Sequence, residues 1–228
     1  MRYPQMSYFE QYAGGTVDSF FRTFAKPGDL VFDIGANLGQ STMSAAVAVG
    51  IAGRVYSFEP NPVTFKVMSA NLKRMGLVNV TPVELALSDR SGSVDFYVDM
   101  RAEFGSQGSS LRELDDLKAQ GKTKKTSVKC STLDAFCAEH QLQPKLLKID
   151  VESFEPQVVA GGRNFIEGAR PIILFEFWES WWDKGFRELF EYLAPLYRLI
   201  RIQDGMDVEK WYYSNVGPGV ADILCLPR

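Results

Sequence analysis

The sequence predicts an α/β fold in which a mostly parallel sheet carries helices on both faces. Short segments rich in Val, Ile, Leu and Phe alternate with longer amphipathic segments through most of the chain. Glycines or acidic residues follow some of the apolar segments directly, as they do at the ligand-binding edge of such sheets. The end of the chain indicates two strands paired as an antiparallel hairpin. Because no repeat or linker-like break interrupts the sequence, we expect a single domain over residues 1–228.

The first half of the chain indicates two strand–helix units. Pro62 fits the first turn of the second helix, where a missing N–H is harmless. The expected elements are a helix over residues 17–25 within an N-terminal helical segment 1–29, a strand over 30–34, a helix over 39–49, a strand over 54–58 and a helix over 62–75.

The second half is less regular at its start. Residues 101–126 are rich in Gly, Ser and charge, with a short helical segment near 110–120, and we interpret this stretch as a lid or substrate loop. The other expected elements are strands over 80–87, 94–98, 127–130, 146–149, 171–177, 197–202 and 220–226, and helices over 132–139, 155–166 and 184–193.

Composition narrows the class of protein. With 228 residues, 46% hydrophobic and 23% charged, the chain can bury the core of one globular domain. The net charge of -3 disfavours a nucleic-acid partner. The three cysteines Cys130, Cys137 and Cys225 lack disulfide or zinc spacing, and no apolar stretch suits a signal peptide or membrane span. We therefore expect free thiols and a cytoplasmic location.

The first chemical signal is the sequence DIGANLG at residues 33–39, between a strand and a helix. Gly35 permits a tight turn, Gly39 lets the helix start close to a ligand, and Asp33 offers a carboxylate. That carboxylate suits a cationic amino-acid moiety better than a pyrophosphate. The glycines alone are explained equally well by ordinary turn chemistry.

The second signal is Glu59, which follows the apolar strand over residues 54–58. An acidic side chain there can accept hydrogen bonds from both ribose hydroxyls of a nucleoside. A nicotinamide dinucleotide is the rival ligand, but its G-x-G-x-x-G fingerprint lacks its third glycine here, and Asp33 would face the phosphates. A nicotinamide-dependent oxidoreductase is therefore less favoured.

The third signal is the emerging strand that contains Lys148, Asp150 and Glu152. Alternation along the strand places these side chains on one side. A carboxylate or lysine there can take a proton from a hydroxyl, which makes all three candidate catalytic residues. The single histidine, His140, falls near the end of a surface helix and is a poor candidate base.

Two more acids, Glu155 and Glu176, follow, and Glu176 ends the next strand, within reach of Asp150. Adjacent carboxylates can share a proton, pair with Lys148, or hold a magnesium ion. We favour pairing with Lys148, so a magnesium site at Asp150 and Glu176 is not favoured. The aromatic residues that come next either line an acceptor site or are core or homo-oligomer contacts; they are Phe177, Trp178, Trp181 and Trp182.

Together these segments resemble the FkbM-type methyltransferases over residues 31–176. The matching segments are DIGANLG at 33–39, FEPNP at 58–62, ALSD at 86–89, STLD at 131–134 and LKIDVE at 147–152, with Glu155 after it. The resemblance implies a Rossmann-like class I methyltransferase fold with a seven-stranded sheet. It also implies S-adenosylmethionine as cofactor and O-methylation of a saccharide, polyketide or other small natural product. Ser153 stands where the family typically has glycine.

The resemblance also implies roles for individual residues. The methionine part of the cofactor would contact Asp33, Gly35, Asn37 and Gly39. Glu59 would bind the ribose, and Asn61 and Ser88 would lie near the adenine. Asn61 is equally well explained as a helix N-cap and Ser88 as a strand-end hydrogen bonder. A methyltransferase-like binding module without activity is the alternative function.

Overall fold

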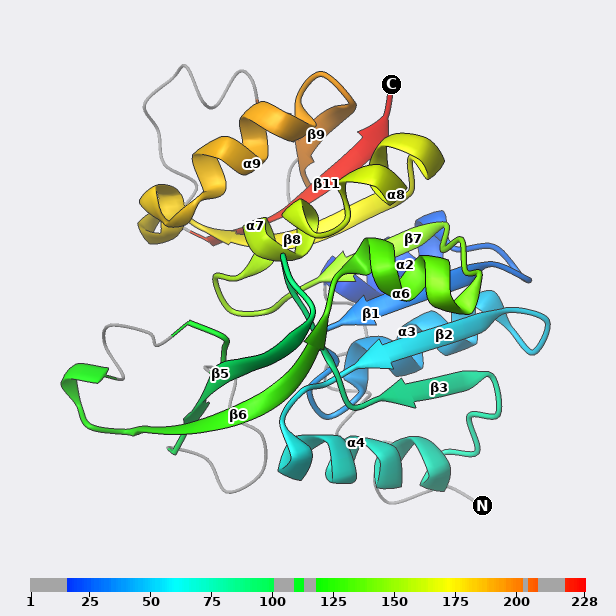
Figure 1. The fold of residues 1–228 in the computed structure, drawn as a ribbon. Helices are drawn as coiled ribbons and strands as arrows, with labels where there is room; N and C mark the ends of the chain where they lie inside the picture. Colours follow the sequence, from blue (N-terminus) through cyan, green and yellow to red (C-terminus); the bar gives the residue numbers. More distant parts are fainter. Residues whose placement is uncertain (1–15, 101–108, 113–117, 203–204, 209–219) are drawn as a thin grey trace.

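The computed structural model describes residues 16–100, 109–112, 118–202, 205–208 and 220–228. Its main sheet has eight strands, of which β10 is a two-residue extension at one edge. The strand order is β10 (Met206–Asp207), β9 (Tyr197–Arg201), β11 (Val220–Pro227), β8 (Ile172–Trp178), β7 (Leu146–Ile149), β1 (Leu30–Ile34), β2 (Arg54–Phe58) and β3 (Val80–Val83) (Figure 1).

The main sheet is mostly parallel. β3, β2, β1, β7 and β8 run in one direction, whereas β11 lies antiparallel between β8 and β9. This confirms the predicted parallel core, the seven-stranded arrangement and the antiparallel C-terminal pair, with β10 as an addition.

Helices cover both faces of the sheet because its central strands are apolar on both sides. In β1, Val31 packs with one core cluster, while Phe32 and Ile34 pack with another. The first cluster includes α2 (Thr16–Phe24) and α3 (Gln40–Val49), and the second includes α6 (Leu133–His140), α7 (Glu155–Ala160), α8 (Arg163–Ala169) and α9 (Phe186–Leu193). α4 (Pro62–Arg74) packs beside β3, and the 3-10 helix η1 (Glu179–Lys184) precedes α9.

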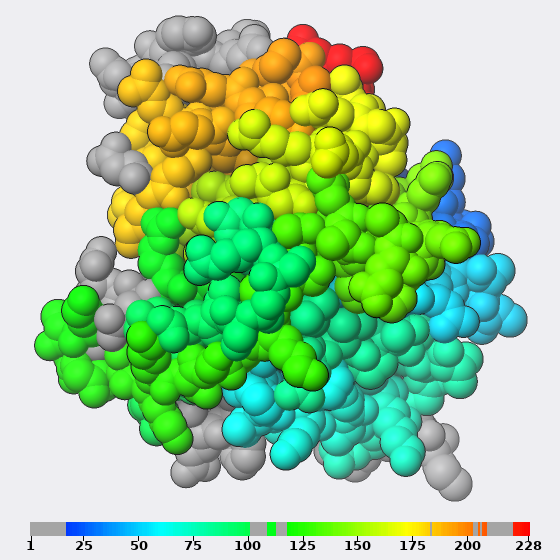
Figure 2. All heavy atoms as spheres, viewed as in Figure 1, coloured from blue at the N-terminus to red at the C-terminus, as the bar shows by residue number. Residues whose placement is uncertain are grey.

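A second, three-stranded sheet lies beside the main one. It has the order β4 (Ala86–Leu87), β6 (Thr123–Ser131) and β5 (Gly92–Asp99), and β5 and β6 pair antiparallel along their length. Its small core includes Val94, Phe96 and Val128. Figure 2 shows this small sheet in green below the yellow and orange helices α7, α8 and α9.

Several predicted boundaries differ from the structure. The strand over 80–87 is two strands in different sheets, because the chain leaves the main sheet after β3. The helix over 155–166 is broken at Gly161, where a Cβ would lie 2.0 Å from the Ser88 carbonyl oxygen. Residues 123–126 belong to β6 rather than to a loop. The rest of the predicted lid lies largely outside the described residues, as do residues 1–15.

All three cysteines are free and buried, as predicted. None of the helices in the described part of the chain is long and apolar enough to cross a membrane.

Candidate active site

The turn after β1 brings the ends of three strands into contact. Gly35 has φ +80°, and a Cβ there would lie 1.8 Å from the backbone oxygen of Asp150. The Gly35 N–H donates to the Phe58 carbonyl at the end of β2, and the Asp150 N–H donates to the Ile34 carbonyl. Glycine is therefore required at position 35, since any side chain would push β1 away from the end of β7.

Glu59 is held by backbone N–H groups from two turns. Its Oε1 accepts from the Asn61 N–H at 2.8 Å, and its Oε2 accepts from the Asn37 N–H at 3.1 Å. Burial raises the pKa of Glu59 to about 7, against the lowering effect of these two hydrogen bonds. Asn37 has φ +49°, and its buried Oδ1 has no hydrogen-bond partner. Glu59, the residue predicted to bind the ribose, thus lies beside the glycine-rich turn.

Asn61 and Ser88 both have structural roles. Asn61 caps α4, because its side chain accepts from the Val63 N–H at 3.1 Å. Ser88 is fully enclosed; its hydroxyl donates to Asp89 and its N–H donates to the Ser131 carbonyl. Asn61 remains next to Glu59, whereas the contacts of Ser88 match those of a strand-end residue.

Asp33 and Lys148 form a buried ion-pair network beneath the turn. The Asp33 Oδ2 accepts from the hydroxyls of Ser41 and Thr42 at 2.7 and 2.6 Å. The Lys148 Nζ lies 3.4 Å from Asp33 Oδ1 and 3.2 Å from Asp150 Oδ2. Asp33 therefore faces the protein interior, and the predicted pairing of Lys148 with Asp150 is present.

Lys148 is held as a cation. Burial by itself would lower its pKa, but the charges of Asp150 and Asp33 raise the pKa above its usual range. Its Nζ also donates to the Gly35 carbonyl at 3.0 Å. An ammonium group donates protons and cannot accept one, so the neighbouring carboxylates are the better candidate bases.

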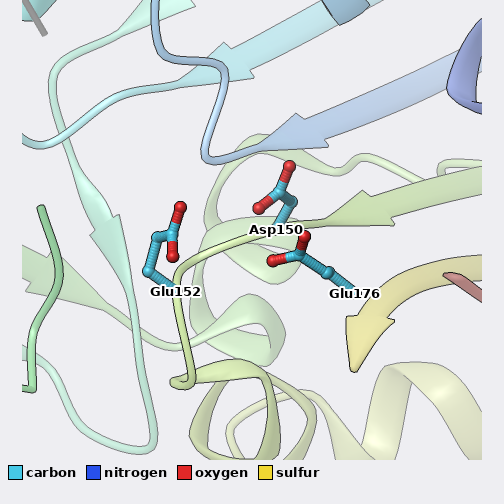
Figure 3. Close-up of side chains that lie close together, drawn as sticks. All are labelled: Asp150, Glu152 and Glu176. Atoms are coloured by element: carbon cyan, nitrogen blue, oxygen red, sulfur yellow. The ribbon is translucent and has the colours of Figure 1, made fainter. Parts of the chain in front are cut away.

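Three carboxylates meet at the ends of β7 and β8. Asp150, Glu152 and Glu176 each direct an oxygen into one cluster, within 4.8 Å of one another (Figure 3). Burial, and then the charge of Asp150, raises the pKa of Glu152 to about 9 and that of Glu176 to about 7. The cluster can share protons, and its oxygen donors are of the type that binds a divalent cation. The sequence pattern had suggested only Asp150 and Glu176 as such a pair.

The turn that carries Glu152 is left-handed at two successive residues. Glu152 has φ +55° and Ser153 has φ +75°, which explains why glycine suits position 153. The fully buried Glu155 accepts from the Val151 N–H at 2.8 Å, and burial raises the pKa of Glu155 well above its usual range. From the other side, the hydroxyl of Ser110 contacts the carbonyls of this turn. Ser110 had no sequence signal, because its segment gave no regular pattern.

Most of the aromatic residues at and just after the end of β8 belong to the core. Trp181 is buried and packs against Phe186, and Trp182 stacks on Phe190 at 5.8 Å between ring centroids. Trp178 is 40% exposed and hydrogen-bonds to Glu176. His140 is exposed at the end of α6, as predicted. Trp178 is thus the aromatic residue of this group best placed to meet a ligand.

Comparison with known proteins adds family information to this geometry. The family model for the methyltransferase FkbM domain matches residues 33–201. The chain is 25% identical to the hexuronic acid methyltransferase AglP of Haloferax volcanii, over 66% of this chain and 56% of that protein. It is 32% identical to the 31-O-demethyl-FK506 methyltransferase FkbM of Streptomyces tacrolimicus, over 60% of each. The matches thus span less than two thirds of either relative.

Solved structures share the fold. A structure of methyltransferase FkbM from Methylobacillus flagellatus KT has a TM-score of 0.55 at 12% identity, covering 97% of this chain and 58% of that one. A putative rRNA-methylase from Clostridium thermocellum has a TM-score of 0.51 at 14% identity, covering 92% and 94%. At these identities the similarity concerns the fold alone.

Proposed function

Because the chain belongs to the FkbM methyltransferase domain family, we propose that it transfers a methyl group from S-adenosylmethionine to a hydroxyl oxygen. The observation that carries the proposal is the Glu59 carboxylate, fixed by the N–H groups of Asn37 and Asn61 beside the Gly35 turn. A buried carboxylate fixed in this way is suited to accept the two hydroxyl hydrogens of a ribose.

The residues of the turn fit the cofactor. We assign Glu59 to the ribose and the backbone at Gly35, Asn37 and Gly39 to the methionine part. The unpartnered Oδ1 of Asn37 is available to accept a hydrogen bond there. Asp33 supports this turn from within, through Lys148 and the Gly35 carbonyl. We place the adenine near Asn61, which lies next to Glu59; Ser88 is enclosed and is not assigned to the cofactor.

Asp150 is the proposed proton acceptor. When bound, S-adenosylmethionine would supply the methyl group: its S–CH3 bond would break as the new C–O bond forms, a neutral thioether would leave, and the acceptor hydroxyl would lose its proton. Lys148 holds Asp150 Oδ2 at 3.2 Å, so the Asp150 Oδ1 takes that proton. Glu152 and Glu176 complete the acceptor side of the site, and much of the rate enhancement comes from holding the two reactants in line.

The acceptor class is proposed from the relatives. AglP is described as acting on hexuronic acid and FkbM on 31-O-demethyl-FK506, so a saccharide or polyketide hydroxyl is favoured. Trp178 supports this proposal, since an exposed indole beside carboxylates suits the apolar face of a sugar or macrolide ring. Neither acceptor requires a nucleic-acid partner.

The test combines calorimetry with turnover. We expect Glu59→Ala to abolish S-adenosylmethionine binding, and Asp150→Asn to keep wild-type affinity while losing transfer of labelled methyl to a panel of hexuronic acid glycosides and hydroxylated macrolides. Glu84→Ala is the matched control, because this exposed glutamate follows the neighbouring strand β3. Undiminished binding in Glu59→Ala would refute the cofactor site. Binding without any transfer by the wild type would instead favour a binding module.

A further inference from the structure

The turn over residues 151–153 needs support from outside itself. Two successive non-glycine residues, Glu152 and Ser153, have φ values of +55° and +75°. Left-handed backbone is strained at each such residue, and it persists where surrounding contacts enforce it. The turn directs the Glu152 carboxylate toward Asp150 and Glu176 (Figure 3). A contact that fixes this turn therefore fixes one side of the carboxylate cluster.

Ser110 makes such a contact. Its Oγ lies 2.7 Å from the Glu152 carbonyl oxygen and 3.1 Å from that of Val151, and its hydroxyl donates to them. The same Oγ accepts from the Arg112 N–H at 3.2 Å. Ser110 is 1% exposed, so water does not readily replace these bonds.

The segment that holds Ser110 is attached to the small sheet. Two backbone hydrogen bonds, of 2.8 and 3.1 Å, join Ser110 to Tyr97 in β5. Arg112 extends the attachment by donating to the Lys184 carbonyl at 3.3 Å, at the end of η1. Glu155 also holds the turn, but it lies in the same stretch of chain. Ser110 instead ties the turn to a different part of the fold, 42 residues away.

We propose that Ser110 is a positioning residue for methyl transfer, which holds the turn over residues 151–153 so that Glu152 stays with Asp150 and Glu176. The inference rests on the proposed function and deepens it. Ser110 lies in the connection between β5 and β6 of the small sheet, whereas the site is otherwise built at the ends of the main-sheet strands.

The test uses three substitutions at Ser110 and one beside it. Ser110→Ala and Ser110→Cys remove the strong donor, the latter with little change in size, and Ser110→Thr keeps a hydroxyl. Ser109→Ala is the matched control, because the neighbouring Ser109 hydroxyl accepts a hydrogen bond from the Asp99 N–H in β5. Two readouts are used: kcat and KM with S-adenosylmethionine and whichever panel acceptor is methylated, and amide hydrogen exchange over residues 151–154.

In the Ala and Cys variants we expect kcat to fall about 10- to 100-fold, the range for a slight misplacement of a reacting group. The KM and calorimetric affinity for S-adenosylmethionine should stay at wild-type values, and exchange over 151–154 should rise. Thr should restore both readouts, and Ser109→Ala should change neither. Wild-type kcat and exchange in the Ala and Cys variants would overturn the proposal, as would an equal loss in Ser109→Ala.

The two proposals fail separately. If the wild type neither binds S-adenosylmethionine nor transfers methyl groups, the proposed function fails, while hydrogen exchange still shows whether Ser110 holds the turn. If the wild type is active and exchange is unaffected by loss of the hydroxyl, only the role of Ser110 fails. Should Ser110→Ala unfold, Ser110→Cys decides the result, since it nearly preserves the volume of the buried side chain.

Discussion

Gly35 is the residue on which the site geometry depends most directly. Its φ of +80° disfavours any side chain, and an added Cβ would lie only 1.8 Å from the Asp150 carbonyl oxygen. We expect Gly35→Ala to lower the free energy of unfolding by about 3 kcal/mol or more, since left-handed strain of about 1–2 kcal/mol adds to the clash. Urea unfolding measures this loss, and calorimetry should show lost cofactor binding.

Gly28 is the control for this prediction. Its φ is +92°, but a Cβ there would meet nothing within 4 Å. Gly28→Ala therefore carries the backbone strain without the clash, and it should cost only about 1–2 kcal/mol. Equal losses in the two variants would show that the contact between β1 and the end of β7 is unimportant.

Among the secondary-structure elements, the ends of β7 and β8 carry carboxyl groups with raised pKa values. Burial and the charge of Asp150 raise the pKa of Glu152 from 4.5 to about 9. The folded state thus binds a proton more tightly than the unfolded state. The stability that this proton contributes to the folded state is fully present below about pH 4.5 and is lost as the pH rises through about 9.

Glu152→Gln removes this dependence, because glutamine does not titrate. Relative to the wild type, the variant should gain about 2 kcal/mol of stability between about pH 7 and pH 9, a range that starts at the pKa of Glu176. Urea unfolding at both pH values measures the difference. Glu179→Gln, at an exposed glutamate just after β8, should follow the wild type. Parallel pH curves for wild type and Glu152→Gln would contradict the raised pKa.

The elements differ in how well the sequence predicts them. The predicted bounds of β1, β2 and β7 agree with the structure, because each is a short apolar run that ends at a turn or an acidic residue. The break between α7 and α8 depends on the close approach of Gly161 to Ser88. These two residues are 73 positions apart in the chain (161 − 88). Contacts of that kind leave no local pattern in the sequence.

In the candidate site, too, some features follow from local sequence patterns and others depend on contacts between distant residues. Residues 33–39, Glu59 and Asp150 could be proposed from the sequence because parallel strands end at one edge of a sheet. The inward orientation of Asp33 and the cationic state of Lys148 required the packed structure, since both depend on the neighbours of a buried side chain. A left-handed turn places Glu152 in the carboxylate cluster, and the sequence did not indicate this turn because neither of its left-handed residues is a glycine.

For the whole molecule, cofactor binding should appear as added stability. The proposed ligand would contact the ends of β1 and β2, each of which is paired with a strand on both sides in the main sheet, so binding should oppose global unfolding. A ligand at a hundred times its Kd adds about 2.7 kcal/mol, which corresponds to a rise in Tm of about 5–10 °C for a chain of this size. Thermal unfolding with and without S-adenosylmethionine measures the rise.

Glu59→Ala should lose this rise while Glu84→Ala keeps it. A wild-type Tm that stays constant up to millimolar S-adenosylmethionine would count against the cofactor assignment for the molecule as a whole.

The chain enters and leaves the small sheet at one place. Ala86 pairs with Cys130 and Leu87 with Ser131, so the chain returns at the end of β6 to where it departed after β4. A segment whose two ends already meet can change in length at little entropic cost. A change of length within residues 88–131 should therefore leave the strand order of the main sheet intact.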